Sequence, residues 1–317
     1  MLARAPAWTC RLGAICCCWL LGSPLAAASS FTAIQVAGGD EARANCTGSP
    51  VAAAAAAGQQ PTFSELLPGS LPVAGKRDIA WIWLGSSTQR YTHAALGSGT
   101  HAASLHAITR GQNGRELVLE LPPERVIEDR LPRLADLDGD GQDEAIVVES
   151  HASRGAALVV YAIDRSGSQQ RWLERARSEP VGAMRWLNPV GVADFDGDGH
   201  SEIASVSTPH IGGVLTLYRY APPHLRTVAR MGGVSNHRMG SPEQRLSAIV
   251  RGPRGPLVVV PDQAFARLLL LQWRAGQGWR EAAAPVGLPA PVERMRERGE
   301  AVCVELRGGA WLRINAR

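Results

Sequence analysis

Residues 134–148 read LADLDGDGQDEAIVV, and residues 192–206 read VADFDGDGHSEIASV. The two stretches begin 58 positions apart and carry aspartates, glycines and a glutamate in the same order. Each continues to a glycine, Gly155 or Gly213, and then enters an apolar run typical of a β-strand. The duplication indicates a repeat protein in which each copy forms one structural unit.

Weaker copies of the same pattern flank the two clear ones. They read GKRDIAWIW at residues 75–83, GPLVVV at residues 255–260 and GEAVCV at residues 299–304. Steps of 66, 58, 54 and 44 residues separate the equivalent positions, which are Asp78, Glu144, Glu202, Pro256 and Glu300. Units of this length, with three or four strands each, are typical of a β-propeller. The sequence therefore predicts an all-β fold over residues 71–317, a β-propeller of about five or more four-stranded blades.

Short apolar runs divided by Gly and Pro make up most of residues 71–317, with almost no helical periodicity. The candidate strands are Ile79–Leu84, Glu116–Leu121, Ala145–Glu149, Ala156–Ile163, Ile203–Ser207, Val214–Tyr220, Leu257–Val260, Leu268–Trp273, Ala301–Leu306 and Ala310–Ile314. Many of these runs are continuously apolar rather than alternating. Such runs predict sheets that are covered on both faces.

The fifth unit has too few residues after Glu300 to form a complete blade. Residues 29–70 are weakly patterned, and within them Phe31–Val36 has the character of a strand. This segment is a candidate for the strand that the fifth unit lacks. Residues 50–58 are of low complexity, and we interpret them as a linker or a short nascent helix.

Residues 1–28 have the features of an export signal. Arg4 and Arg11 supply the positive region, residues 12–21 form a short apolar core, and residues 26–28 offer a small-residue cleavage site. The apolar stretch is too short and too interrupted for a clear membrane span, with an uncleaved anchor as the alternative. The sequence thus predicts a periplasmic or secreted protein with no stable membrane span after signal cleavage.

Signal cleavage would leave two of the six cysteines, Cys46 and Cys303. An even pair in an exported protein favours a disulfide. It would join the start of the mature chain to its last strands and lock the ring shut. Two separate thiols are the alternative.

The charge of the chain gives little support for a nucleic-acid partner. Lys and Arg total 33 and Asp and Glu total 29, which leaves a net charge of +4. Nearly all the positive charge is arginine, and the densest basic stretch, residues 294–298, includes Glu297. We interpret the arginine content as a composition bias and predict no nucleic-acid binding.

The two acidic stretches have the chemistry of a site for a hard cation. Aspartates at loop positions 1, 3 and 5 direct carboxylates inward, and the glycines between them allow a sharp turn. Calcium binds six to eight such oxygens at about 2.3–2.6 Å. An EF-hand is excluded, because its position 12 would be Val147 or Ser205, each inside a candidate strand.

A nine-residue loop between two strands fits the pattern. Side chains at positions 1, 3, 5 and 9 would bind the ion, together with the backbone carbonyl of position 7. The first set is Asp136, Asp138, Asp140 and Glu144 with the Gln142 carbonyl, and the second is Asp194, Asp196, Asp198 and Glu202 with the His200 carbonyl. Asp143 is an alternative or an addition to Glu144. The sequence predicts two Ca²⁺ sites of modest affinity, roughly 10⁻⁴–10⁻³ M, that stabilise the fold.

The repeats and their acidic loops resemble those of the FG-GAP/VCBS-repeat proteins, a family of calcium-binding β-propellers. The resemblance covers residues 71–317 in outline and is specific at residues 131–164 and 189–220. It implies that each acidic loop joins the first and second strands of a blade. Residues 70–74 and 248–252, at the equivalent places of the first and fourth units, have no carboxylates. The resemblance therefore implies two metal sites rather than five.

Polar and aromatic residues concentrate in the loops expected on the blade face opposite the metals. Such side chains suit sugar or peptide recognition. This predicted rim consists of Arg90, Tyr91, His93, His151, Arg154, Trp186, Asn188, His210, Asn236 and His237. Four of its members are histidines, so a transition-metal site among them is a minor alternative.

The motifs of the common enzyme classes are missing from the sequence. It has no Gly-x-Ser-x-Gly, no His-Glu-x-x-His and no phosphate-binding glycine loop. We therefore favour a non-catalytic binding or interaction module with a glycan or protein ligand. The alternatives are an envelope glycan hydrolase or lyase, with its site on the face opposite the calcium loops, and a structural part of a larger assembly.

Overall fold

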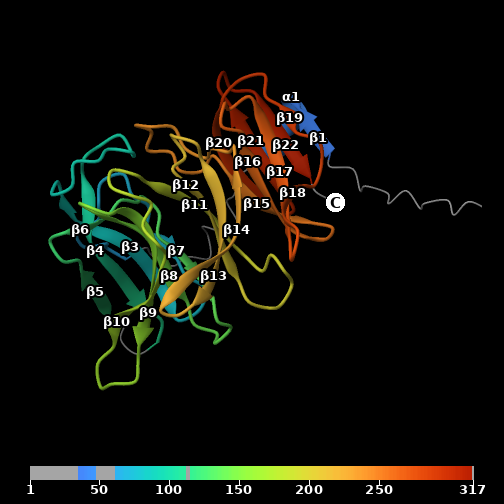
Figure 1. The fold of residues 1–317 in the computed structure, drawn as a ribbon. Coiled ribbons are helices and arrows are strands. Elements are labelled where there is room, and N and C mark those ends of the chain that lie inside the picture. The colour runs from blue at the N-terminus through green and yellow to red at the C-terminus, as the bar shows by residue number, and fades with distance from the viewer. Residues whose placement is uncertain (1–34, 48–60, 112–114, 316–317) are drawn as a thin grey trace, which may run out of the picture. The chain divides into compact units, whose positions relative to one another are not determined.

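The computed structural model describes residues 35–47, 61–111 and 115–315, all within one compact unit, Thr32–Arg317. Within these residues the regular structure is one short helix and twenty-two β-strands. Figure 1 shows their arrangement. The prediction of an all-β fold is confirmed. The proposed signal at residues 1–28, the linker at residues 50–58 and most of Phe31–Val36 lie outside the described residues.

The strands pair in five antiparallel groups of four, which we call meanders 1 to 5. Meander 1 comprises β2 (Val73–Ala74), β3 (Ile79–Thr88), β4 (His101–Thr109) and β5 (Glu116–Glu120). Meander 2 comprises β7 (Arg133–Ala135), β8 (Glu144–His151), β9 (Gly155–Asp164) and β10 (Arg171–Arg177). Meander 3 comprises β11 (Leu187–Ala193), β12 (Glu202–Ser207), β13 (Val214–Ala221) and β14 (His224–Gly232).

The last two meanders follow the same plan. Meander 4 comprises β15 (Ala248–Gly252), β16 (Gly255–Pro261), β17 (Arg267–Arg274) and β18 (Gly278–Glu281), and β19 (Val286–Gly287) also pairs with β17. Meander 5 comprises β20 (Val292–Arg298), β21 (Ala301–Leu306), β22 (Trp311–Asn315) and the N-terminal β1 (Gln35–Gly38). A strand from the start of the chain thus supplies the fourth position of the last meander.

Meanders 1 to 3 are not separate sheets. The short strand β6 (Arg125–Ile127) pairs with both β4 and β8, and one parallel pair, Arg177 with His224, links β10 to β14. These links join the three meanders into a 13-stranded sheet. The blade number and the closure of a ring stay predictions.

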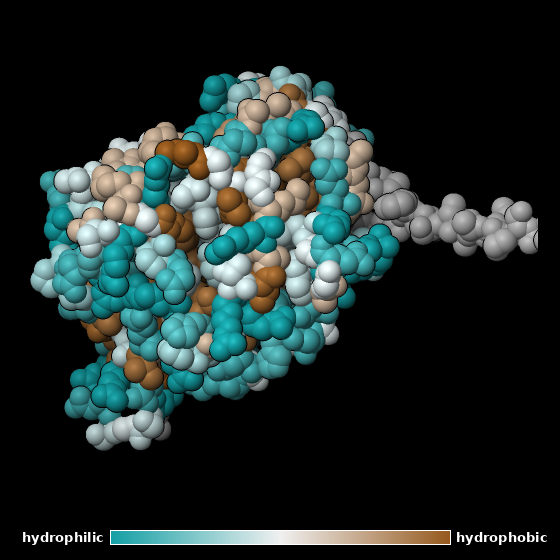
Figure 2. Space-filling model, in the orientation of Figure 1, coloured by the Kyte–Doolittle hydropathy of each residue, from teal (hydrophilic) through white to brown (hydrophobic). Residues whose placement is uncertain are grey.

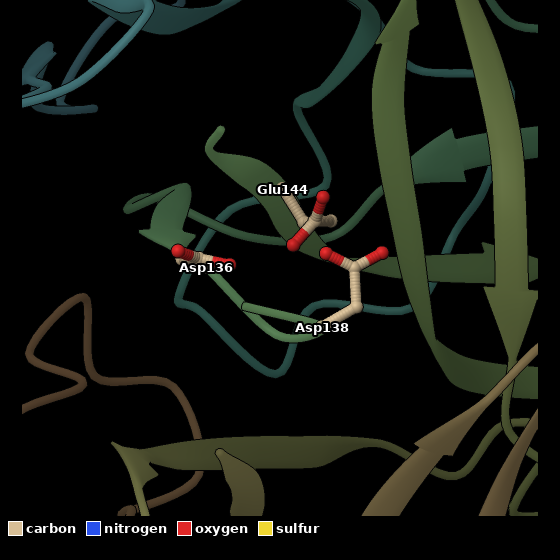
Figure 3. A group of neighbouring side chains, drawn as sticks. All are labelled: Asp136, Asp138 and Glu144. Carbon is tan, nitrogen blue, oxygen red and sulfur yellow. The ribbon is translucent and has the colours of Figure 1, made fainter. Parts of the chain in front are cut away.

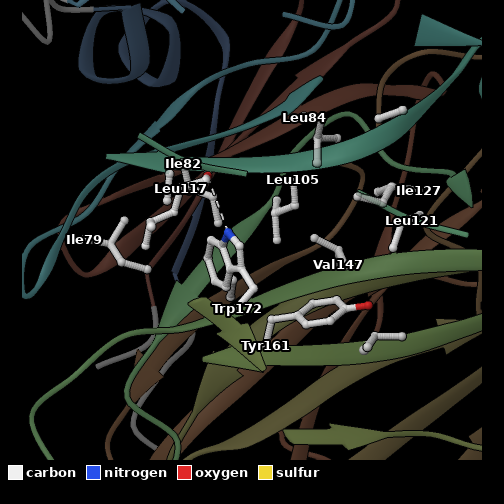
Figure 4. Close-up of a cluster of buried hydrophobic side chains, with 14 of the residues drawn as sticks. Ile79, Ile82, Leu84, Leu105, Leu117, Leu121, Ile127, Val147, Tyr161 and Trp172 are labelled. Carbon is white, nitrogen blue, oxygen red and sulfur yellow. Dashed lines mark hydrogen bonds between the residues drawn. The ribbon is translucent and has the colours of Figure 1, made fainter. Parts of the chain in front are cut away.

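Four hydrophobic clusters lie between successive meanders. One cluster joins meanders 1 and 2 through residues such as Ile82, Leu105, Tyr161 and Trp172 (Figure 4). The second joins meanders 2 and 3, the third joins meanders 3 and 4, and the fourth joins meanders 4 and 5. Meanders 2, 3 and 4 therefore bury their faces against the units that precede and follow them in the chain.

The continuous apolar runs have a direct explanation in this packing. Along β8 of meander 2, Ala145 and Val147 belong to the cluster shared with meander 1. Ile146 and Val148 belong to the cluster shared with meander 3. Successive side chains of a strand point to opposite faces, so a strand covered on both faces needs apolar residues at every position. Outer strands do not: in β10, whose sequence is RWLERAR, only Trp172 and Ala176 are buried.

The N-terminal segment is attached to meander 5 at several points. Strand β1 pairs with β22 over four residues, and helix α1 (Gly39–Thr47) follows it directly. Cys46 of α1 and Cys303 of β21 form a disulfide, with their Cα atoms 5.6 Å apart. Arg298 of β20 also donates a 3.2 Å hydrogen bond to the Cys46 carbonyl. The start of the described chain is thereby held against its last strands.

Candidate metal centre

Two acidic loops connect the first strand to the second in meanders 2 and 3. The first acidic loop, residues 136–144, runs from the end of β7 to the start of β8. The second acidic loop, residues 194–202, runs from the end of β11 to the start of β12. Both therefore occupy the connection that the repeat pattern implies.

The first aspartate of each loop organises the backbone around it. Asp136 accepts hydrogen bonds from the amides of Gly139 (2.7 Å) and Gly141 (3.1 Å). In the second acidic loop Asp194 accepts the same two bonds, from the third and fifth residues after it, at 2.7 and 2.9 Å. All four glycines adopt positive φ, between 79° and 91°, which other residues adopt only with strain. The turn geometry thus accounts for the first aspartate and the two glycines of the DxDGDG sequence.

The closing glutamate is held from the opposite direction. Glu144 Oε2 accepts the amide of Leu137 at 2.7 Å, and Glu202 Oε2 accepts the amide of Phe195 at 3.0 Å. Leu137 and Phe195 are themselves buried in hydrophobic clusters. Each loop is therefore anchored to the core at its second residue, and the two loops are geometric copies in their backbone.

Three carboxylates converge within each loop, as Figure 3 shows for Asp136, Asp138 and Glu144. In that group, and in Asp194, Asp196 and Glu202, one oxygen from each residue lies within 4.8 Å of the others. Among the residues that the structure describes, these are the two groups of at least three potential metal ligands. Ligand sets made only of oxygen suit calcium better than metals that favour nitrogen or sulfur.

The other predicted ligands play a different part in the structure. Asp140 uses its two oxygens to accept bonds from Gln142, from the backbone amide at 2.7 Å and the side-chain amide at 2.9 Å. Asp198 likewise accepts the backbone amide of His200 at 2.9 Å. The fifth loop position therefore supports the backbone at position 7, whose carbonyl was the predicted ligand.

Asp143, the eighth residue of the first acidic loop, pairs with residues outside the loop. It is buried and lies 3.0 Å from the guanidinium of Arg77, and its amide donates to Asp78 at 2.6 Å. The alternative in which Asp143 replaces Glu144 is not supported by this arrangement. Asp143 instead connects meander 2 to the loop between β2 and β3.

Burial of the closing glutamates changes their acidity. The pKa of Glu144 is raised to about 7, chiefly by burial; the Leu137 amide opposes this shift, and the charges of Asp138, Asp140 and Asp136 add to it. Burial also raises the pKa of Glu202, but there Arg219 opposes the shift. A carboxylate that is buried beside other carboxylates is stabilised by a cation. The chemistry of the first acidic loop therefore fits a bound divalent ion.

A pocket of about 290 Å³ opens beside the first acidic loop. Its lining combines the loop with strands β9 and β10 and consists of Asp138, Asp140, Gln142, Asp143, Glu144, Ala162, Ile163, Asp164, Arg165, Ser166 and Arg175. Asp138 and Asp140 are exposed at this pocket, whereas Glu144 is buried at its wall.

Most of the predicted rim is buried rather than presented to solvent. Tyr91, His93, Trp186, Asn188, Asn236 and His237 have at most 9% of their surface exposed. His93 lies 2.7 Å from the fully buried Glu128, which also accepts a 2.6 Å bond from Ser150. Trp186 donates to the Glu128 carbonyl at 2.9 Å. These residues form a polar network that joins loops, and the expectation of a solvent-facing rim is corrected for them.

The histidines of the predicted rim do not form a three-residue metal site. His210 Nε2 lies 2.8 Å from His237 Nδ1, and His237 Nε2 donates to the Ser241 carbonyl at 2.8 Å. The pKa of each ring is lowered to about 4, mainly by burial; the charge of His93 contributes to the shift of His210, and that of His210 to the shift of His237. The pair is neutral at pH 7, and Trp186 packs against both rings.

The remaining members of the predicted rim differ from one another. The Arg90 guanidinium donates to backbone carbonyls, among them those of Leu121 (3.2 Å) and Pro122 (3.1 Å), so it braces a connection. His151 accepts a 3.1 Å bond from the Ser153 amide, and Arg154 is exposed. Of the ten residues, Arg154 has the character expected of a ligand-facing side chain.

Sequence reasoning missed three residues that the fold makes important. Glu128 and Gln244 are buried at the centre of the loop network, and Gln244 bonds to Asp129, Asn188 and Arg130. Arg219 contacts the second acidic loop from β13. Glu128 and Gln244 lie among charged residues of connections, and Arg219 is a single arginine within a strand, so no repeated spacing pattern marks any of them.

Comparison with known proteins supports the repeat assignment. Residues 136–205 match the family model described as FG-GAP-like repeat. The match begins at the first aspartate of the first acidic loop and ends in β12, after the second acidic loop. Residues 136–205 are FG-GAP-like repeat sequence. The resemblance seen in the sequence is thus confirmed for the region with the two acidic loops.

The chain is also similar to a chain in the crystal structure of BBS1N in complex with ARL6DN, soaked with mercury. The sequences are 12% identical, the match covers 80% of this chain and 67% of that chain, and the TM-score is 0.34. No curated protein matches the sequence.

Proposed function

We propose that this chain is an exported, calcium-binding β-propeller that acts as a non-catalytic binding or interaction module. The observation that carries the proposal is the pair of acidic loops, whose backbones and carboxylate groups are copies of each other. The hydrophobic clusters between successive meanders support the propeller. The disulfide and residues 1–28 support export to an oxidising compartment, the periplasm or the medium.

Calcium would be held in the first acidic loop by Asp136, Asp138 and Glu144. When bound, the ion would neutralise carboxylates that repel each other at this distance. The chain's own contribution is to preorganise the oxygens, because the two glycine amides and the Leu137 amide already hold Asp136 and Glu144 in place. The role of the ion in this proposal is structural rather than catalytic.

A protein ligand is favoured by the apolar residues that the structure exposes. Leu71, Met184, Ile211 and Met239 are 48–62% exposed, and all lie in connections at the strand ends opposite the acidic loops. Figure 2 shows one face of the molecule, on which hydrophobic residues are scattered among hydrophilic ones. Exposed apolar side chains on connections at the same strand ends favour an interaction surface there. None of the described helices is long and apolar enough to span a membrane.

Calcium titration followed by calorimetry and by thermal unfolding tests this proposal. The mature chain should bind Ca²⁺ and unfold at a higher temperature with Ca²⁺ than with EDTA, because binding to the folded state alone stabilises it. The substitution Asp138→Ala should remove most of the stabilisation. A chain that binds no Ca²⁺ at millimolar concentration would contradict the proposal. Binding of the calcium-loaded chain to a glycan array would favour a glycan over a protein ligand.

A further inference from the structure

The two acidic loops match in their backbone but differ in what faces the closing glutamate from the next strand. In meander 3, Glu202 of β12 pairs directly with Arg219 of β13. In meander 2, Ala145 pairs with Tyr161, so the same register places Ala162 opposite Glu144. A fixed cationic side chain therefore faces the second acidic loop, whereas a methyl group faces the first.

Arg219 makes several contacts with the second acidic loop. Its Nη2 and Nε atoms lie 2.9 and 3.2 Å from Glu202 Oε1, and Nη2 also pairs with Asp196 Oδ2. Nη2 lies 3.9 Å from Asp198. Two of the three carboxylates that would bind a metal ion therefore share one guanidinium.

The first acidic loop has no equivalent contact among the described residues. Arg77 approaches Asp136 at 3.6 Å, but its closer partner is Asp143 at 3.0 Å, which lies outside the carboxylate group. Arg165 and Arg175 line the pocket beside the loop. Arg165 pairs with Asp78, and the charge of Arg175 acts on Asp138 and Glu144 without forming an ion pair with either. No described arginine bridges two of the three carboxylates Asp136, Asp138 and Glu144.

We propose that Arg219 is a built-in cation that takes over the role of calcium in the second acidic loop. The inference rests on the proposed function, because it assumes that the first acidic loop binds Ca²⁺. An ion entering the second loop must displace a guanidinium that already offsets the repulsion between Asp196 and Glu202. The first loop therefore depends on calcium, whereas the second folds without it and binds Ca²⁺ at least about tenfold more weakly.

Arg219→Met tests the inference, because it removes the charge and keeps most of the apolar stem. In EDTA the variant should unfold at a lower temperature than the wild type. Ca²⁺ should remove this difference in unfolding temperature. Calorimetry should show about a tenfold gain in affinity at the weaker site. Arg226→Met is the matched control, since the exposed Arg226 pairs with Arg219 across β13 and β14 but forms no ion pair among the described residues.

Ala162→Arg is the reciprocal variant. Ala162 is partly exposed and lines the pocket beside Asp138 and Glu144, so an arginine there has space to reach the carboxylates. It should weaken Ca²⁺ binding at the first acidic loop about tenfold and reduce the loss of stability in EDTA. This variant keeps the inference testable if Arg219→Met does not fold.

The possible results separate the inference from the proposed function. Both the inference and the proposed function are supported if the wild type has one strong and one weak Ca²⁺ site, Arg219→Met strengthens the weak site and Ala162→Arg weakens the strong one. Two sites of equal affinity that neither variant changes overturns the role of Arg219 and leaves calcium binding intact. No Ca²⁺ binding in any variant overturns the proposed function. In that case a selective destabilisation of Arg219→Met in EDTA, absent in Arg226→Met, still supports Arg219 as the internal cation.

Discussion

Cys46 and Cys303 are 257 positions apart in the chain, yet their Cα atoms are 5.6 Å apart and a disulfide joins them. Both residues are completely buried and pack with Ala42 and Trp311. The bond lies next to the pairing of β1 with β22, so one covalent link and one strand pairing connect the same two parts of the molecule. Release of the N-terminal segment therefore requires both to be lost.

Removal of the disulfide should destabilise the protein. Cys303→Ala should lower the free energy of unfolding by about 2–5 kcal/mol, because the cross-link restricts the unfolded chain across a very long loop. Denaturant unfolding measures the loss. Cys46→Ala and the double variant should show a similar loss, since each removes the same bond. Equal stability of wild type and variants would show that strand pairing alone holds the segment.

Calcium should stabilise the wild type through the first acidic loop. At 100 times the dissociation constant, a ligand that binds the folded state alone adds about 2.7 kcal/mol to the free energy of unfolding. Asp138→Ala should abolish most of this gain, as measured by thermal unfolding with EDTA and with Ca²⁺. The exposed Glu179 lies outside both acidic loops, so Glu179→Ala should respond to Ca²⁺ as the wild type does.

The His210–His237 pair should make stability depend on pH. Burial lowers the pKa of both rings to about 4, against 6.5 in the unfolded chain. Between these values the unfolded state binds protons that the folded state does not, so stability falls as the pH falls from about 6.5 to 4. The slope is at most about 1.4 kcal/mol per pH unit for each ring. Urea unfolding at several pH values measures it.

A double variant isolates this contribution from other groups that titrate in the same range. His210→Gln together with His237→Gln removes both rings, so the stability of the variant should decrease less steeply between pH 6.5 and 4. Other carboxylates and histidines contribute equally to both proteins. Parallel pH profiles for variant and wild type would refute the assignment.

Asn188 should prove to be a structural residue rather than a ligand contact. Its side-chain amide is fully buried and donates to the carbonyls of Asn236 (3.1 Å) and Gln244 (2.8 Å). Asn188→Ala leaves these acceptors without that donor. It should lower the free energy of unfolding by about 1–3 kcal/mol for each unsatisfied carbonyl. Arg154→Ala, in an exposed residue, should leave the unfolding midpoint unchanged. Normal stability of Asn188→Ala would restore a ligand-binding role.

Much of the fold could be predicted because buried inner strands have a strong signature. The continuously apolar runs correspond to β8, β9, β12, β13, β16 and β17, which are covered on both faces. Strands β10 and β14 were not predicted, since their charged residues face solvent and leave only isolated apolar positions. Helix α1 was also missed: it is short, and within it Ala42 and Cys46 are buried.

The predicted rim shows where sequence reasoning about sites is weak. Sequence reasoning treats a loop position as exposed, but the connections of different meanders pack on one another. The amide of Gly240, for example, donates to the Ala95 carbonyl at 2.9 Å, although the two residues belong to different meanders. Polar side chains between such connections become buried and satisfy backbone groups, as Asn188 and Trp186 do.

The sequence by itself determined the two acidic loops, because their geometry is local. Within nine residues, aspartate and glutamate oxygens accept hydrogen bonds from nearby amides, and glycines supply the positive φ angles. The local sequence is therefore enough to determine the structure of each loop. Only the tertiary structure decided what faces each loop. Alignment of the two repeats at a spacing of 58 residues matches Arg219 with Tyr161, but strand pairing sets Arg219 opposite Glu202 and Ala162 opposite Glu144. Hairpin register depends on the length of the connecting turn, and a one-residue difference exchanges the face to which each side chain points.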